Sequence, residues 1–395
     1  MLIPVLVAVV GITLGAGGIV LLRPFAQASP PQAATAARRD GQAVQRPLSD
    51  AAIRARIDPS VVDVTATLTY DNETASGTGF VVNAAAGLIL TNNHVVRDAT
   101  SVTVTVPASK RTYPVRIVGV DVAADIAVLE IRRTTGLPSA PLGDSAGVGA
   151  GMPVISFGNQ AGAGGSPAVA PGVISGTGRT IQADDGASGF TETLRDMLAT
   201  TARIEPGDSG GPLADASGAV IGVDTAAGTG GTATGYAIPI DTAIAAERRI
   251  AAGLRGPGVS LGVGGFLGAI VGSGTASSPV AQRTAELGGG RGTAARSASS
   301  SCVTTRRGAV APAAIAPARA GALVIGVLCG TGAATAGIVA GDVITAAGGR
   351  RVASPDALTT IVNGRRPGSM MSVSWVSTRG TARTTQVRLG AAPAL

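Results

Sequence analysis

The sequence predicts a mostly β protein of two or three domains, and three observations support this. Its 395 residues exceed one compact domain, which usually takes about 100 to 200 residues. Glycine is abundant at 58 residues while aromatic residues make up 2%, so the cores must be built from Val, Ile, Leu and Ala. Short β-branched runs follow one another with no long amphipathic helix between them, which favours antiparallel sandwiches or barrels.

The N-terminal segment is apolar. Residues 2–22 carry no charge, and about 20 such residues can cross a bilayer as a helix. The Ala-Gln-Ala sequence at 26–28 has the form of a signal-peptidase site. We therefore expect residues 1–28 to be a signal peptide or a transmembrane anchor, and the protein to be extracytoplasmic, either secreted or anchored in the cell envelope. Residues 29–50, rich in Ala, Pro, Gln and Arg, are expected to form a disordered linker.

The middle segment, residues 51–245, carries most of the predicted strands. The best helical candidate, residues 242–254, follows them and overlaps a linker expected at 246–258. The expected strands are residues 61–68, 79–83, 88–91, 101–106, 115–120 and 126–131.

Three side chains of this segment carry chemistry. His94, the only histidine, follows an apolar run and is expected at a strand end beside a polar turn. Asp125 precedes a run that predicts a buried strand. Ser209 lies in Gly-Asp-Ser-Gly-Gly-Pro at 207–212, where glycine lets consecutive backbone N–H groups aim at one point. Each also has a purely structural interpretation: a surface histidine, a turn aspartate and a glycine-rich turn.

Together the three residues predict nucleophilic catalysis. A serine hydroxyl is a weak nucleophile until a base takes its proton, and an imidazole with a reference pKa of about 6.5 suits that task near neutral pH. A carboxylate then orients the imidazole and compensates its charge. We therefore predict His94 as the general base, Asp125 as the orienting carboxylate and Ser209 as the nucleophile.

No metal and no cofactor are expected. One histidine and two cysteines are too few ligands for a Cys/His zinc site. The glycine pattern also contains neither a phosphate-binding loop nor a dinucleotide fingerprint.

The motifs resemble those of the HtrA/Deg family of trypsin-like serine proteases, and more narrowly its exported bacterial members with one PDZ domain. The resemblance covers residues 60–270 and 321–390. It implies a chymotrypsin-like pair of β-barrels with the site between them, and an oxyanion hole formed by the N–H groups of Gly207 and Ser209. It also implies cleavage of unfolded or exposed protein segments and assembly as a homo-oligomer such as a trimer. The segments that carry it are 76–80, 91–96, 121–129, 207–212 and 235–239.

Two residues near the nucleophile bear on the loop conformation and on the substrate preference. Asp208 stands where some relatives carry asparagine, and we expect it to hold the loop. Arg203 lies six residues before Ser209, at a position that borders the specificity pocket in this family. If Arg203 points inward, the pocket favours an acidic P1 side chain. If it points to solvent, the pocket is apolar and favours small aliphatic P1 residues, and an unpaired buried arginine is costly.

Residues 259–395 resemble a PDZ domain, an α+β fold. Phe266, Leu267 and Gly268 match the family's carboxylate-binding loop, so peptide C-termini are the expected ligands. The alternative is a small β-domain with no ligand. The expected strands are 321–328, part of 333–345, 372–376 and 385–389.

A low-complexity insert, residues 273–320, interrupts this region. Cys302 in the insert and Cys329 beyond it could form a disulfide outside the cytoplasm. Two free thiols are the alternative, because spacing alone does not fix the geometry.

The C-terminal charge leaves other functions open. Residues 251–395 hold 14 arginines against three acidic residues, a net charge of +11. Nucleic acid is not an expected partner, because the arginines are scattered and Trp375 is the only aromatic residue after Phe266. The alternatives to a protease are a peptide-binding chaperone or scaffold with little proteolysis, and an envelope anchoring protein that uses this basic segment.

Overall fold

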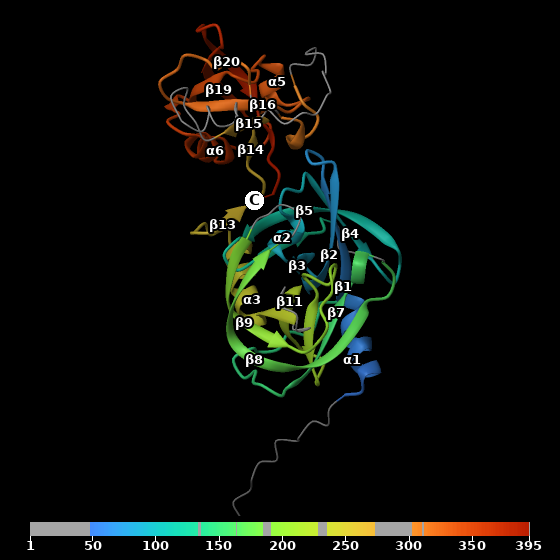
Figure 1. Cartoon of the computed structure of the whole chain (residues 1–395). Helices are drawn as coiled ribbons and strands as arrows, with labels where there is room; N and C mark the ends of the chain where they lie inside the picture. Colours follow the sequence, from blue (N-terminus) through green and yellow to red (C-terminus); the bar gives the residue numbers. More distant parts are fainter. Residues whose placement is uncertain are drawn as a thin grey trace, which may run out of the picture. The chain divides into compact units, whose positions relative to one another are not determined.

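The computed structural model describes residues 48–132, 136–162, 164–184, 191–227, 235–272, 302–309 and 312–394 (Figure 1). Strands dominate these residues, and the prediction of a mostly β protein is confirmed. The expected signal peptide or anchor, residues 1–28, lies outside the described part, as does nearly all of the expected linker, residues 29–50. None of the described helices is both long and apolar enough to span a bilayer.

The first six strands form one closed ring of antiparallel pairs. The order β5-β4-β1-β2-β3-β6 is closed by a second pairing, between β5 and β6. Three of the expected ranges, 61–68, 88–91 and 101–106, match β1, β3 and β4 at both ends, because each is a short run between turn residues. The strands are β1 (Val61–Leu68), β2 (Glu73–Asn83), β3 (Leu88–Thr91), β4 (Ser101–Val106), β5 (Arg111–Asp121) and β6 (Ile126–Glu130).

The next six strands form a second closed barrel, green to yellow in Figure 1. Its order is β10-β11-β12-β9-β8-β7, so β10 pairs with β7 to close it. The nucleophile motif at 207–212 lies in the connection between β9 and β10, except for Pro212, which begins β10. The strands are β7 (Pro153–Gly158), β8 (Ala168–Asp184), β9 (Thr191–Thr200), β10 (Pro212–Asp215), β11 (Val220–Ala227) and β12 (Gly235–Pro239).

The two barrels share one apolar core. A single buried cluster joins Phe80 and Ile126 of the first barrel to Phe157 and Ile238 of the second. Phe80 and Phe157 are both fully buried, and aliphatic side chains supply most of the rest, as the composition predicts. Burial of this kind contributes about 25 cal/mol per Å² of apolar surface, so the shared core holds the two barrels together.

Several helices lie directly before or after strands in the chain. The expected helix at 242–254 is present as α3 (Ile240–Ala251), shifted toward the N-terminus because Pro239 precedes its first turn. The sequence analysis missed α1 (Asp50–Ile57) and α6 (Pro355–Asn363), although Ser49 and Ser354 cap them in a recognisable way. Shorter elements are α2 (Asn93–Val96), α5 (Gly332–Thr335), η1 (Asp58–Ser60), η2 (Gln160–Gly162) and η3 (Arg306–Gly308).

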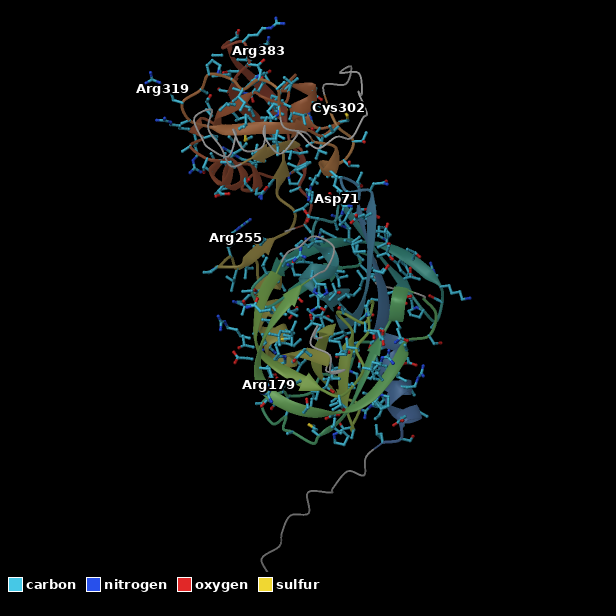
Figure 2. The ribbon with its side chains drawn as sticks, in the orientation of Figure 1. Asp71, Arg179, Arg255, Cys302, Arg319 and Arg383 are labelled. Carbon is cyan, nitrogen blue, oxygen red and sulfur yellow. A yellow bond between two sulfur atoms is a disulfide. The ribbon has the colours of Figure 1, made fainter. Side chains whose placement is uncertain are left out.

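The C-terminal part contains a separate antiparallel sheet, in the order β15-β16-β17-β19-β20 with β18 beside β17. Its core includes Trp375, which is 3% exposed, and the inner face of α6. Arg319 and Arg383 are exposed and extend from the ribbon (Figure 2). β13 (Val259–Leu261) pairs with β5 and so extends the sheet of the first barrel, and β14 (Gly265–Phe266) pairs with β21 (Gly390–Ala391) as a separate two-stranded sheet. The strands of the C-terminal sheet are β15 (Ala269–Gly272), β16 (Ala322–Val327), β17 (Val343–Ala347), β18 (Arg350–Arg351), β19 (Met370–Val376) and β20 (Ala382–Arg388).

Part of the expected low-complexity insert has a defined place in the structure. Cys302 and Cys329 form a disulfide with a Cα–Cα distance of 5.0 Å. Val303 donates its N–H to Val327 O at 2.7 Å and accepts the Cys329 N–H at 2.9 Å. Residues 302–309 are therefore attached to the end of β16, whereas residues 273–301 lie outside the described part of the chain.

The disulfide should stabilise the C-terminal sheet measurably. Closing a loop of 27 positions contributes about 3.5 kcal/mol in the chain-entropy model. Trp375, the only tryptophan, is buried in this sheet, so its fluorescence reports unfolding there. In urea titrations the variant C302S/C329S should lose about 3.5 kcal/mol of unfolding free energy. A thiol assay of unreduced, denatured wild type should find no thiol, and a count of two would contradict the pairing.

Candidate active site

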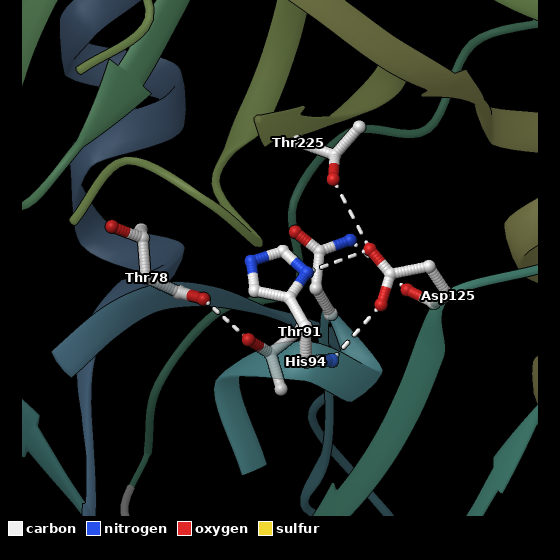
Figure 3. Close-up of polar contacts among 6 residues, drawn as sticks. Thr78, Thr91, His94, Asp125 and Thr225 are labelled. Atoms are coloured by element: carbon white, nitrogen blue, oxygen red, sulfur yellow. Dashed lines mark hydrogen bonds and ion pairs between the residues drawn. The ribbon is translucent and has the colours of Figure 1, made fainter. Parts of the chain in front are cut away.

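His94 lies in α2, which begins two residues after β3 ends. The sequence placed it at a strand end, but the chain has already turned into a short helix there. The imidazole Nδ1 is 2.8 Å from Asp125 Oδ2, and the His94 N–H donates to Asp125 Oδ1 at 2.9 Å (Figure 3). Asp125 thus holds both the ring and the main chain of His94.

Asp125 is fully buried in the turn between β5 and β6. Its φ of 52° lies in the left-handed region, which aspartate tolerates better than most residues. Asn92 Nδ2 and Asn93 N donate to its main-chain oxygen at 3.0 and 3.1 Å. Thr225 Oγ1, from β11, donates to Asp125 Oδ2 at 3.1 Å. The carboxylate is therefore compensated by hydrogen bonds and fixed relative to both barrels.

The contact with Asp125 determines the tautomer of His94. A carboxylate only accepts hydrogen bonds, so Nδ1 must carry the proton, and Nε2 of the neutral ring is then the basic nitrogen. Figure 3 shows this second ring nitrogen turned away from Asp125.

Ser209 lies in the nucleophile loop, residues 207–211, which is hydrogen-bonded to the first barrel. Thr78 donates its N–H to Ser209 O at 2.8 Å, and its hydroxyl donates to Gly207 O at 2.7 Å. A β-carbon at Gly77 would lie 2.6 Å from Val95 Cγ1 and 3.1 Å from Ser209 O. Because Val95 follows His94 in α2, Gly77 packs between the nucleophile loop and the helix that carries the imidazole.

Glycine is required at two positions of this loop. Gly207 and Gly210 have φ values of 99° and 88°. A β-carbon at Gly210 would also overlap Thr78 O and the Thr91 hydroxyl. The Thr91 hydroxyl in turn donates to Thr78 O at 2.7 Å (Figure 3). The close packing of the loop on β2 and β3 therefore depends on these glycines.

Sequence reasoning missed the threonines that support the site. Thr78 was visible only as part of the motif at 76–80, and Thr91 as part of the motif at 91–96. Thr225 has no local signal at all, since it lies 100 residues from the Asp125 that it contacts.

Two further carboxyl groups are buried at the nucleophile loop. Asp208 and Asp224 are 4% and 0% exposed. Burial raises the pKa of Asp208, which a hydrogen bond from the Glu205 N–H partly offsets. Burial raises the pKa of Asp224 well above its usual range; the Ser156 hydroxyl opposes this shift and the charge of Asp208 adds to it. The sequence analysis named Asp208 but not Asp224.

Arg203 lies at the surface. Its side chain is 77% exposed and forms an ion pair with Glu205. This placement favours the alternative in which Arg203 faces solvent and leaves the pocket apolar.

The residues expected to bind a peptide carboxylate directly precede β15, the edge strand of the C-terminal sheet. Phe266 belongs to β14 and pairs with Gly390, while Leu267 is buried in the core of that sheet. Gly268 has a φ of 82°, and a β-carbon there would overlap the Thr331 side chain. As for metals, the described residues contain no group of three or more His, Cys, Asp or Glu side chains that could hold an ion.

Comparisons with known proteins identify a family of serine proteases. Residues 77–223 match the family model of the trypsin-like peptidase domain. Serine protease PepD of Mycobacterium tuberculosis is 30% identical over 384 residues, which cover 93% of this chain and 72% of that protein. Serine protease Do-like HtrB of Bacillus subtilis is 42% identical over 142 residues, 36% of this chain and 30% of that protein.

A solved structure of the HtrA-type protease AlgW with a tripeptide is 28% identical and covers 88% of this chain and 98% of its own, with a TM-score of 0.45. The similarity to PepD extends over most of both proteins. The chain therefore belongs to the HtrA/Do family of trypsin-like serine proteases.

Proposed function

We propose that this protein is a serine endopeptidase of the HtrA type, with His94, Asp125 and Ser209 as its catalytic triad, that cuts unfolded or exposed protein segments. The observation that carries the proposal is the 2.8 Å contact between His94 Nδ1 and Asp125 Oδ2, beside a nucleophile loop anchored on Thr78. Digestion of an unfolded casein by the full-length chain tests the proposal, and we expect fragments without any added cofactor.

In the proposed reaction, His94 Nε2 takes the proton of the Ser209 hydroxyl as Ser209 Oγ attacks the peptide carbonyl. Asp125 stabilises the imidazolium that forms, and the N–H groups of Gly207 and Ser209 stabilise the oxyanion. His94 then passes its proton to the leaving amine. A water molecule, which gives its proton to His94, then attacks the acyl-enzyme. This step releases the second product and restores the Ser209 hydroxyl.

The exposure of Arg203 predicts the P1 preference. An apolar pocket should cleave a peptide with P1 valine at least about tenfold faster than the matched peptide with P1 glutamate, because the carboxylate would lose its hydration. R203A should leave this ratio unchanged, since the guanidinium faces solvent and pairs with Glu205. Faster cleavage of the glutamate peptide, lost in R203A, would place Arg203 in the pocket.

For residues 259–395 we propose a PDZ-like domain that binds peptide C-termini and recruits substrates or regulates the site. The support is the sheet with its helix α6, and the position of Phe266, Leu267 and Gly268 directly before the edge strand β15, where an added strand could pair. The domain limits, 51–245 for the protease and 259–395 for this part, are part of the proposal, as is assembly into a homo-oligomer such as a trimer.

We place the protein outside the cytoplasm, where the Cys302–Cys329 disulfide would persist. Relatives named as periplasmic occur in Haemophilus influenzae and Chlamydia pneumoniae. Residues 1–28 would attach the protein to the membrane if they are not cleaved.

A further inference from the structure

Two buried acids, Asp208 in the nucleophile loop and Asp224 in β11, interact with each other, and the proposed reaction does not use them. Asp224 is in β11, next to Thr225, and the two side chains point to opposite faces of the strand. Thr225 contacts Asp125, while Asp224 accepts a hydrogen bond from the Ser156 hydroxyl at 2.6 Å. Asp208 precedes the nucleophile in the chain, and its charge acts on Asp224.

Asp224 is tied to the nucleophile loop by its main chain. Gly210 donates its N–H to Asp224 O at 2.8 Å, and Asp224 donates its own N–H to Gly211 O at 2.8 Å. These are the two residues that follow Ser209. A displacement of Asp224 therefore moves the segment that carries the nucleophile.

Asp208 braces the other side of the same loop. Its Oδ2 accepts the Glu205 N–H at 2.8 Å, and its main-chain oxygen accepts the Gly211 N–H at 2.9 Å. A β-carbon at Gly158 would overlap the Asp208 carboxyl, so that group has no room to move toward β7. The N–H groups of Gly207 and Ser209 flank Asp208 in sequence, so their orientation depends on it.

The charges around the pair are of one sign. The Ser156 hydroxyl and the Phe157 N–H face Asp224 from β7, and on the loop side Asp208 faces it with Glu205 close by. Arg203 is directed to the surface by its ion pair with Glu205. None of the ion pairs among the described residues includes Asp208 or Asp224. One oxygen of each, Oδ1, is buried and has no hydrogen-bond partner in the described part of the chain.

We propose that Asp224 is a positioning residue for the nucleophile loop, and that the loop keeps its catalytic form only while the Asp208–Asp224 pair holds a proton. With one proton the pair has a single negative charge and one O–H donor for an otherwise unpartnered oxygen. With none, two carboxylates are buried without a cation, which is the arrangement that folded proteins avoid. The loop then gives way, because Asp224 lies on β11, which is paired on both sides within the closed barrel.

The consequence is an alkaline limit to activity. A group whose pKa is raised in the folded state loses its proton as the pH rises through that raised value, so the active form is favoured on the acid side. Activity that rises with deprotonation of His94 should therefore fall again at higher pH, by about tenfold per pH unit beyond the titration of the pair. The inference rests on the proposed role of Ser209, since the loop matters through that residue.

The test compares the full-length wild type with D224N and D208N from pH 5 to 10. The first measurement is the rate of labelling by diisopropyl fluorophosphate, an uncharged reagent that reports the reactivity of Ser209. Wild type should show a bell-shaped profile. Both variants should rise to a plateau, because an asparagine leaves a single carboxylate and supplies an N–H donor.

The second measurement is amide hydrogen exchange of a peptide covering residues 205–211, corrected for the intrinsic rate at each pH. In wild type the protection should fall at least about tenfold between the pH of maximal labelling and pH 10. In the variants it should stay constant. The control D196N changes an exposed aspartate of the same barrel and should behave as wild type.

The outcomes separate the two proposals. An absence of labelling at every pH would overturn the role of Ser209, and hydrogen exchange would then still decide the inference about the loop. A wild-type plateau up to pH 10 in both measurements, or an alkaline fall that persists in the variants, would overturn the inference. If D224N does not fold, D208N tests the same pair.

Discussion

Replacing Ser209 by alanine should lower the rate of casein digestion by about 10⁶-fold, to background. The alanine has no hydroxyl, so no acyl-enzyme can form, and only the small residual catalysis of the oxyanion hole and substrate binding remains. The measurement is the initial rate of peptide release from unfolded casein by equal amounts of full-length wild type and S209A.

The matched control for this variant is S175A, which removes the hydroxyl of an exposed serine on β8 of the same barrel. It should digest casein at the wild-type rate. Binding of casein by S209A should persist, which distinguishes a protease from a chaperone or scaffold. Equal digestion by S209A and wild type would mean that the nucleophile lies elsewhere.

Replacing Asp125 by asparagine should lower kcat by about 10⁴-fold with little change in KM. An amide that donates toward Nδ1 stabilises the tautomer in which Nε2 carries the proton, and that nitrogen can then no longer accept a proton from Ser209. The size and shape of the residue are retained, so the loss is one of chemistry. The measurement is the steady-state rate on a fluorogenic peptide.

The companion variant for Asp125 is T225V. It removes the 3.1 Å hydrogen bond to Asp125 Oδ2 and leaves the His94–Asp125 contact intact. We expect a loss of about tenfold, since one hydrogen bond to a carboxylate contributes about 1.5 kcal/mol. Activity of D125N within tenfold of wild type would remove Asp125 from the triad.

Much of the first barrel could be predicted from the sequence. Residues 61–68, 88–91 and 101–106 form strands because their β-branched runs end at turn residues, which is a local property. The helix expected at 242–254 is also a local feature of the sequence. It is present as α3, which begins earlier than expected, directly after Pro239. The short helix α2 was missed, because four residues following a strand carry no periodicity.

The sequence by itself determined the residue types of the site. The roles of His94, Asp125 and Ser209 could be predicted from the sequence. His94 is the single histidine, Asp125 precedes an apolar run and Ser209 lies in a glycine-rich motif, and nucleophilic catalysis uses these residue types. Only the tertiary structure showed that β5 closes on β6 and β10 on β7, that Thr225 reaches Asp125 from 100 residues away, and that Asp208 and Asp224 are both buried where the charge of one acts on the other. These contacts arise when barrels close and bring distant strands together, and local sequence patterns record which face of a strand is buried but not which residue it meets there.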